Sequence, residues 1–211
     1  MNKPRIGIVA FFALLLASCG GSGSSSSSGF DGSGSGGDRA EDSIDTALET
    51  GSFKVLVFSK TDGFRHASIE RGIMTLQALG DANDFIVDAT EDASDFTTEN
   101  LAQYRVVVWL NTTLNVLDTD AQQNAFEQFI RGGGGYVGIH SAADTEHDWP
   151  FYGELVGAYF LSHPVQQTAD FDIEQDDHIT VSHLPNPWTT FDELYSFSSN
   201  PRGAVNVLMS V

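Results

Sequence analysis

The fold is decided by the stretch Gly132-Gly133-Gly134-Gly135-Tyr136-Val137-Gly138-Ile139-His140-Ser141-Ala142-Ala143-Asp144-Thr145. A glycine-rich turn leads into residues 136–139, whose continuous apolar character predicts a strand buried on both faces. The chain then turns at His140 and Ser141. Ligands of open α/β sheets bind outside the carboxyl ends of the strands, so we expect His140, Ser141 and Asp144 to lie at the main crevice. The alternative is an ordinary polar loop after a buried strand.

Apolar runs and helical spacing alternate around this stretch. Strands are predicted at 53–59, 85–89, 105–110 and 136–139, and helices at 68–80, 98–103 and 118–131. This alternation favours a parallel sheet with right-handed crossovers. The loops at its carboxyl edge would then be 60–66, 91–92, 111–115 and 140–145. Three of these loops carry polar side chains suited to binding, and their convergence indicates a functional crevice.

The C-terminal part of the chain is less regular. We expect a helix at 149–160 with a proline in its first turn, a strand at 167–174, a polar excursion at 176–185, a strand or edge segment at 192–197 and a strand that begins at 206. The last strand stops at Val211 with no closing turn or helix after it. We therefore expect the sheet to lack its last elements, as in a chain truncated at its C-terminus.

Charge and cysteine content exclude two classes of function. Acidic residues outnumber basic residues 29 to 10, so the chain repels phosphate backbones and nucleic acid is not an expected partner. The only cysteine is Cys19, which lies in the N-terminal leader. The folded part therefore uses neither a disulfide nor a cysteine nucleophile. Residues 53–211 are enough for one domain with a sizeable core.

The N-terminus has the pattern of an export signal. Lys3 and Arg5 precede an apolar run at 6–17, which is too short to span a bilayer comfortably and suits a signal-peptide core. It ends in Leu-Ala-Ser-Cys-Gly at 16–20. Cleavage near Ser18 without further processing is one interpretation.

The alternative, which we favour, is lipidation. The sequence around Cys19 resembles a bacterial lipobox, which implies a signal peptide at 1–19 and acyl chains such as palmitate on Cys19. The mature protein would be anchored to a membrane of the bacterial cell envelope, either periplasmic or surface-exposed. Residues 20–52 are rich in Gly and Ser and then acidic, so we expect a flexible linker.

Several segments of the predicted domain resemble one family. They are Lys60-Thr61-Asp62-Gly63-Phe64-Arg65-His66-Ala67-Ser68-Ile69, Gly133 to Asp144, Gly157-Ala158-Tyr159-Phe160, His163-Pro164 and Asp192-Glu193-Leu194-Tyr195. Together they resemble the ThuA-like family, named for trehalose utilisation. The resemblance implies a flavodoxin-like, class I glutamine amidotransferase-like parallel sheet with helices on both faces over 53–211, and a role in sugar utilisation. That superfamily usually has a cysteine where this chain has His140, so thiol-dependent amidotransferase chemistry is not expected.

Six histidines lie in the predicted domain: His66, His140, His147, His163, His178 and His183. His66 and His140 fall on two carboxyl-edge loops, so folding could bring them together, and His163 could approach from the side. Two or three neutral imidazoles with Asp144 or Glu193 would suit zinc or another divalent metal. The spacing matches no local metal motif. The alternative is that these histidines cap loops or pair with acids.

The same residues support chemistry without a metal. His140 would act as a general base or acid near neutral pH, with Glu193 or Asp144 orienting it. Arg65 would hold an anionic or polar substrate group, or would pair with a nearby acid. Ser141 would contact the substrate or act as a nucleophile, although it is shifted one place from a Gly-x-Ser-x-Gly motif.

Aromatic side chains beside polar groups suit the apolar faces of sugar rings. Trp149 and Tyr152, just after the turn, are candidates for a sugar platform, and Tyr195 is a further candidate for substrate contact. The alternative is that they are core or rim residues.

Two functional hypotheses follow. The first is a tethered enzyme that acts on a carbohydrate or keto-sugar, either by proton abstraction beside a carbonyl, as in isomerisation or elimination, or by metal-assisted hydrolysis. The second is a non-catalytic carbohydrate-binding module on a membrane tether.

Overall fold

A computed structural model describes residues 52–211. The predicted signal peptide, the lipidation site at Cys19 and nearly all of the predicted linker lie outside the described residues.

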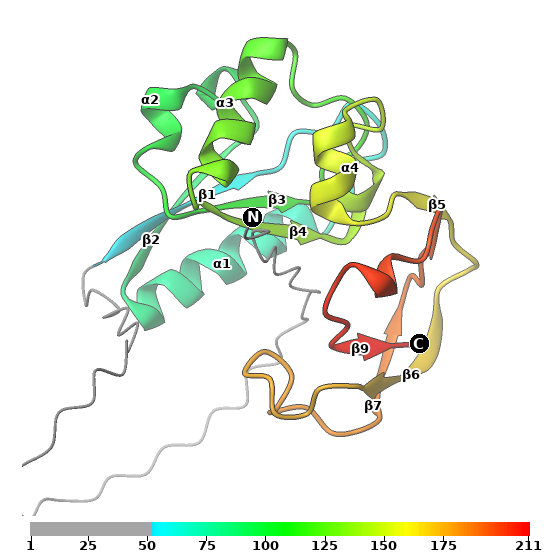
Figure 1. Ribbon diagram of the computed structural model, residues 1–211. Coiled ribbons are helices and arrows are strands. Elements are labelled where there is room, and N and C mark those ends of the chain that lie inside the picture. The colour runs from blue at the N-terminus through cyan, green and yellow to red at the C-terminus, as the bar shows by residue number, and fades with distance from the viewer. Residues whose placement is uncertain (1–51) are drawn as a thin grey trace, which may run out of the picture. The chain divides into compact units, whose positions relative to one another are not determined.

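The described residues are built around a four-stranded parallel sheet (Figure 1). Its strands are β1 (Phe53–Phe58), β2 (Phe85–Thr90), β3 (Val106–Leu110) and β4 (Gly135–Ile139), in the order β2-β1-β3-β4. All three strand pairs are parallel, and the register places Val57 opposite Val108 and Val108 opposite Val137. The prediction of a parallel sheet with crossover connections is confirmed.

Helices cover both faces of this sheet. Helix α1 (Ile69–Asn83) lies on one face, and α2 (Thr98–Leu101), α3 (Asp120–Arg131) and α4 (Pro150–Val156) lie on the other (Figure 1). The larger core joins the second set of helices to the sheet through aromatic side chains: Phe58, Phe96, Trp109, Phe126 and Tyr152. The smaller core is aliphatic and includes Val57, Val108, Leu110 and Ile139. This arrangement is consistent with the flavodoxin-like, amidotransferase-like fold.

The first helix runs past the glycine at which we expected it to end. It continues from Gly80 to Asn83, because the left-handed backbone of Asp84 (φ 58°) ends it with a bond from its N–H to the Gly80 carbonyl. Gly80 has a packing role instead. A Cβ there would lie 2.5 Å from the Phe85 carbonyl oxygen, so glycine permits the close approach of α1 to β2.

Helix α3 begins two residues later than predicted, at a capping box. The Thr119 hydroxyl accepts from the Gln122 N–H, and the Gln122 side chain accepts from the Thr119 N–H. These two contacts fix where the helix starts, so the preceding residues remain part of the loop that leaves the sheet edge.

The C-terminal part forms two small antiparallel sheets. Strand β5 (Phe160–Ser162) pairs with β8 (Ser196–Phe197), and β6 (Gln167–Ile173) lies between β7 (Trp188–Asp192) and β9 (Met209–Ser210). Short 3₁₀ helices occur at η1 (Ala93–Asp95), η2 (His140–Asp144) and η3 (Pro201–Gly203). Helix α4 is shorter than the predicted 149–160 and ends before Gly157, whose φ is 86°.

The segment 192–197, expected to be one strand or edge, is instead the end of β7, an irregular connection at 193–195 and the two residues of β8. Residues 193–195 lie outside the named strands, so the alternation of a strand does not set the directions of their side chains.

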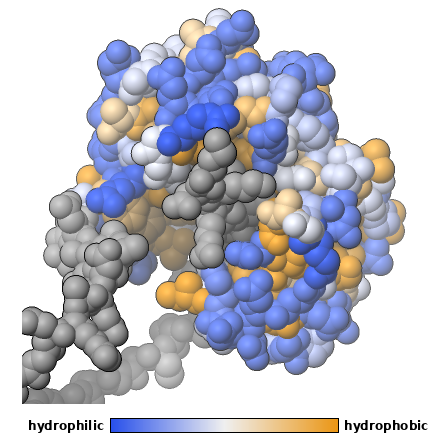
Figure 2. Space-filling model, in the orientation of Figure 1, coloured by the Kyte–Doolittle hydropathy of each residue, from blue (hydrophilic) through white to orange (hydrophobic). Residues whose placement is uncertain are grey.

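The surface view in Figure 2 shows hydrophobic residues scattered over a mostly hydrophilic face. Within residues 52–211, no helix combines the length and apolar character needed to cross a membrane.

Candidate active site

His66 lies on the loop between β1 and α1, which is fastened to the loop after β3. The Asp62 N–H donates to the Thr113 carbonyl (3.0 Å), and Thr61 and Thr113 form an isolated parallel bridge. The Asn111 side-chain amide donates to the Ser68 hydroxyl (2.9 Å) at the start of α1. The loop is therefore held on both sides of His66, and its imidazole points over the carboxyl edge of the sheet.

His140 is the first residue after β4 and has a left-handed backbone, with φ of 52°. Non-glycine residues rarely adopt this conformation, and where they do it is commonly at a functional turn. The sharp turn redirects the chain from β4 into η2. It leaves the imidazole at the strand end and buries the next residue, Ser141, to 1% exposure.

Glu193 completes the cluster from the connection between β7 and β8. Its Oε2 lies 3.3 Å from His140 Nε2 and 3.8 Å from His66 Nε2. Its side chain is only 17% exposed, so the carboxylate faces the histidines and not bulk water. The two imidazole Nε2 atoms are themselves 3.1 Å apart.

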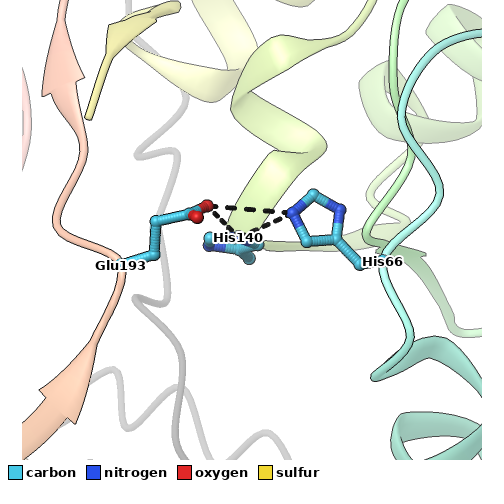
Figure 3. Close-up of side chains that lie close together, drawn as sticks. All are labelled: His66, His140 and Glu193. Atoms are coloured by element: carbon cyan, nitrogen blue, oxygen red, sulfur yellow. Dashed lines mark hydrogen bonds and ion pairs between the residues drawn. The ribbon is translucent and has the colours of Figure 1, made fainter. Parts of the chain in front are cut away.

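Figure 3 shows the three side chains converging from three separate segments, with their nitrogen and oxygen atoms turned toward one another. Their ligand atoms all lie within 4.8 Å of one another. Zinc bound tetrahedrally at 2.0–2.1 Å separates neighbouring ligand atoms by about 3.3 Å. The observed separations of 3.1, 3.3 and 3.8 Å bracket this spacing. Two imidazoles and one carboxylate also form a known catalytic zinc set, so the residues fit a divalent metal.

Burial favours the neutral form of both imidazoles. It lowers the pKa of His66 below its ordinary value, and the negative charge of Glu193 opposes this effect only in part. Burial also lowers the pKa of His140, helped by repulsion from the nearby His66. Both rings therefore have lone pairs available near neutral pH, as metal ligation or general-base catalysis requires.

Tyr195 contacts the cluster on the side of His140. Its hydroxyl lies 3.0 Å from His140 Nε2, and the two ring centroids are 4.4 Å apart. Burial, followed by the charges of Glu193 and Asp144, raises the pKa of Tyr195 well above its ordinary value. The side chain therefore remains a neutral phenol that can donate a hydrogen bond at physiological pH.

A family model described as ThuA, trehalose utilisation, matches residues 54–211. The chain belongs to the ThuA family.

Two solved structures of ThuA-like proteins are similar to this ThuA-family chain. The protein from Bacteroides uniformis ATCC 8492 is 27% identical with a TM-score of 0.66, covering 77% of this chain and 69% of that one. The protein from Parabacteroides merdae ATCC 43184 is 19% identical with a TM-score of 0.60, covering 75% and 67%, and supports the fold alone. Among curated proteins there is no match.

Two of the predicted site residues lie beside the ThuA-family cluster instead of in it. His163 Nδ1 is 3.5 Å from the other carboxylate oxygen of Glu193 and 2.9 Å from the Pro164 carbonyl, and its side chain is 40% exposed. Asp144 Oδ1 pairs with His147 Nε2 at 2.9 Å. The third ligand position that we assigned to His163 is therefore better filled by Glu193.

Arg65 pairs with two nearby acids, which is the alternative to a substrate contact. Its guanidinium contacts Glu70 (2.9 Å) and Glu91 (2.8 Å), and the hydrogen bonds to both acids raise its pKa. The side chain joins the loop after β1 to α1 and to the end of β2. The charge of Arg65 is therefore already paired with two carboxylates, which favours the acid-pairing alternative over a substrate contact.

The prediction that Trp149 and Tyr152 form a sugar platform is wrong, because both side chains are buried. Trp149 is 9% exposed and Tyr152 is fully buried in the aromatic core, because α4 turns these rings toward Trp109 and Phe126. The Tyr152 hydroxyl donates to the Ala142 carbonyl (2.8 Å). Both residues support the turn from beneath and offer no open face to a sugar.

Sequence reasoning did not anticipate two supporting contacts. Ser141, expected to meet substrate, instead has its hydroxyl 3.4 Å from His66 Nδ1. Glu146 is 2% exposed, and its Oε1 accepts from the N–H groups of Val116 (2.9 Å) and Leu117 (2.8 Å). An acid inside a polar loop looks solvent-exposed in a sequence, so only the burial of the loop identifies Glu146 as an anchor.

Proposed function

We propose that this ThuA-family chain is an exported, lipid-anchored enzyme that acts on a carbohydrate or keto-sugar, with His66, His140 and Glu193 holding a divalent metal such as zinc. The convergence of these three ligand atoms within 4.8 Å is the observation that carries the proposal. The family's description, trehalose utilisation, supports the substrate class. A metal there would supply a Lewis acid for a sugar oxygen or an activated water.

Each residue has a definite part in this proposal. His66 and His140 present neutral nitrogens, because burial disfavours their charged forms. Glu193 supplies the negative charge that partly balances a divalent cation. Ser141 orients His66 through Nδ1, which directs Nε2 to the centre of the cluster. Tyr195 carries a proton that it can donate to a sugar oxygen beside His140.

A specific contact favours a second candidate, proton abstraction without a metal. The 3.1 Å separation of the two Nε2 atoms also suits a hydrogen bond in which one imidazole donates to the other. His140 would then act as a general base beside a keto group, with Glu193 stabilising the imidazolium. The two candidates share their residues and differ in whether a metal is needed.

Elemental analysis of the purified full-length protein separates these candidates. We expect one metal per chain, and its loss in His66→Ala, His140→Ala and Glu193→Gln. His178→Ala removes an exposed histidine outside the cluster and serves as the control, which should keep its metal. A wild-type protein that retains no metal after zinc loading, yet turns over a keto-sugar, would replace the metal proposal with the general-base candidate.

Turnover and binding measurements address the non-catalytic module. With carbohydrate and keto-sugar substrates, His140→Ala should bind sugar and lose turnover. Binding by the wild-type protein with no turnover would instead support a binding module. If the wild-type protein neither binds nor converts any sugar, both hypotheses fail.

The membrane anchor is tested separately, by metabolic labelling with radioactive palmitate. We expect label in the wild-type protein and none in Cys19→Ser. The variant should leave the membrane fraction, whereas an unlabelled wild-type protein would contradict the anchor.

A further inference from the structure

The ring contacts of the site extend beyond the metal-binding residues. Successive centroids lie 4.9 Å apart from Phe64 to His66, 4.6 Å from His66 to His140 and 4.4 Å from His140 to Tyr195. The row ends in Phe64, a phenyl ring that is 72% exposed. An exposed apolar side chain is ordinary when it stands alone on a surface. Phe64 differs because its ring stands edge-to-face against the imidazole of His66, a member of the candidate site.

Both sides of Phe64 are fixed by the same threonine. The Gly63 N–H donates to Thr113 Oγ1 (3.2 Å), and Thr113 Oγ1 donates to the Phe64 carbonyl (3.2 Å). Leu114 packs on Gly63, where an added Cβ would lie 2.9 Å from its side chain, and Leu114 is 42% exposed. The phenyl ring is thus held on a braced loop, and the partly exposed side chain of Leu114 packs against the residue that precedes it.

We infer that Phe64 is the apolar platform on which the sugar ring of the substrate rests while its oxygens face His66 and His140. This inference rests on the proposed function and names the subsite that selects a pyranose or furanose ring. Sugar rings present C–H groups on their faces, and an aromatic face next to polar groups suits them. Trp149 and Tyr152 are buried, whereas Phe64 is 72% exposed and its ring contacts His66 of the cluster.

Saturation-transfer NMR and titration calorimetry test the platform with glucose, trehalose and fructose as probes. In wild-type protein the sugar C–H protons should receive saturation from aromatic protons. Phe64→Ala should weaken the binding of the best probe by about three- to tenfold, while Phe64→Trp should restore it. Metal content should match the wild type in both variants, which separates loss of the platform from loss of the cluster.

Phe53→Ala is the matched control. Phe53 is 37% exposed at the opposite end of β1 from the His66 loop, so its removal should leave sugar affinity unchanged. Equal sugar affinity in Phe64→Ala and wild type would overturn the platform and leave the proposed function standing. No binding of any probe by the wild-type protein, with or without added zinc, would overturn both.

Discussion

Burial sets the protonation state of the two central histidines. The folded-state pKa values of His66 and His140 lie below the ordinary 6.5. The unfolded chain therefore binds more protons below that pH than the folded chain does. The free energy of unfolding of metal-free protein should be highest above pH 6.5 and should fall as the pH drops through the lowered pKa values. Histidine NMR titration measures this directly, and midpoints above 6.5 for both rings would contradict it.

The hydroxyl of Tyr195 is the candidate proton donor beside His140. Tyr195→Phe keeps the ring against His140 and removes the hydroxyl that lies 3.0 Å from Nε2. If the phenol supplies a proton during the reaction, kcat should fall about 100-fold with metal content unchanged. The pH dependence of kcat should also change in the variant. Unchanged kcat with an increased KM would make Tyr195 a binding residue only.

The loop after β3 depends on one buried carboxylate. Glu146 accepts the N–H groups of Val116 and Leu117, and its Oε2 accepts from the Gln123 amide (2.8 Å). Glu146→Ala leaves these donors buried without a partner, which should lower the free energy of unfolding by about 2–3 kcal/mol. Glu154→Ala, at an exposed position on α4, should change it by less than about 0.5 kcal/mol. Urea denaturation compares them, and equal effects would show that Glu146 is no anchor.

The parts of the fold and of the site that could be predicted are those that burial or sheet topology determines. The central strands β1 and β3 are largely buried, so their continuous apolar runs identified them. The apolar run at 136–139 also located β4, but β4 is an edge strand of the sheet and only Ile139 in it is fully buried, so the expected burial on both faces was wrong. The same topology brought His66 and His140 together, as predicted, because both follow strands at one sheet edge. The position of Glu193 could not be predicted from the sequence, because it lies in a short, partly exposed connection that belongs to no strand or helix. The role of Tyr152 was predicted wrongly, because the sequence of a helix as short as α4 does not show which of its side chains point into the core.

The three residues of the cluster, His66, His140 and Glu193, are far apart in the sequence and meet only in the folded chain. A metal held by His66, His140 and Glu193 would bind the folded chain and not the unfolded one, so it should stabilise the fold by mass action. Zinc at about 100 times its dissociation constant should add about 2.7 kcal/mol to the free energy of unfolding. Thermal unfolding with zinc and with chelator measures this, with His66→Ala as the control that should not respond. An equal zinc response in that variant would place the metal elsewhere.

We propose that His66, His140 and Glu193 together hold one metal ion. X-ray absorption spectroscopy of the zinc-loaded full-length protein identifies the atoms that bind the metal. We expect two imidazole nitrogens and one carboxylate oxygen at about 2.0–2.2 Å, and loss of one imidazole in either His66→Ala or His140→Ala. A spectrum without imidazole ligands, or one that both variants leave unchanged, would contradict the account.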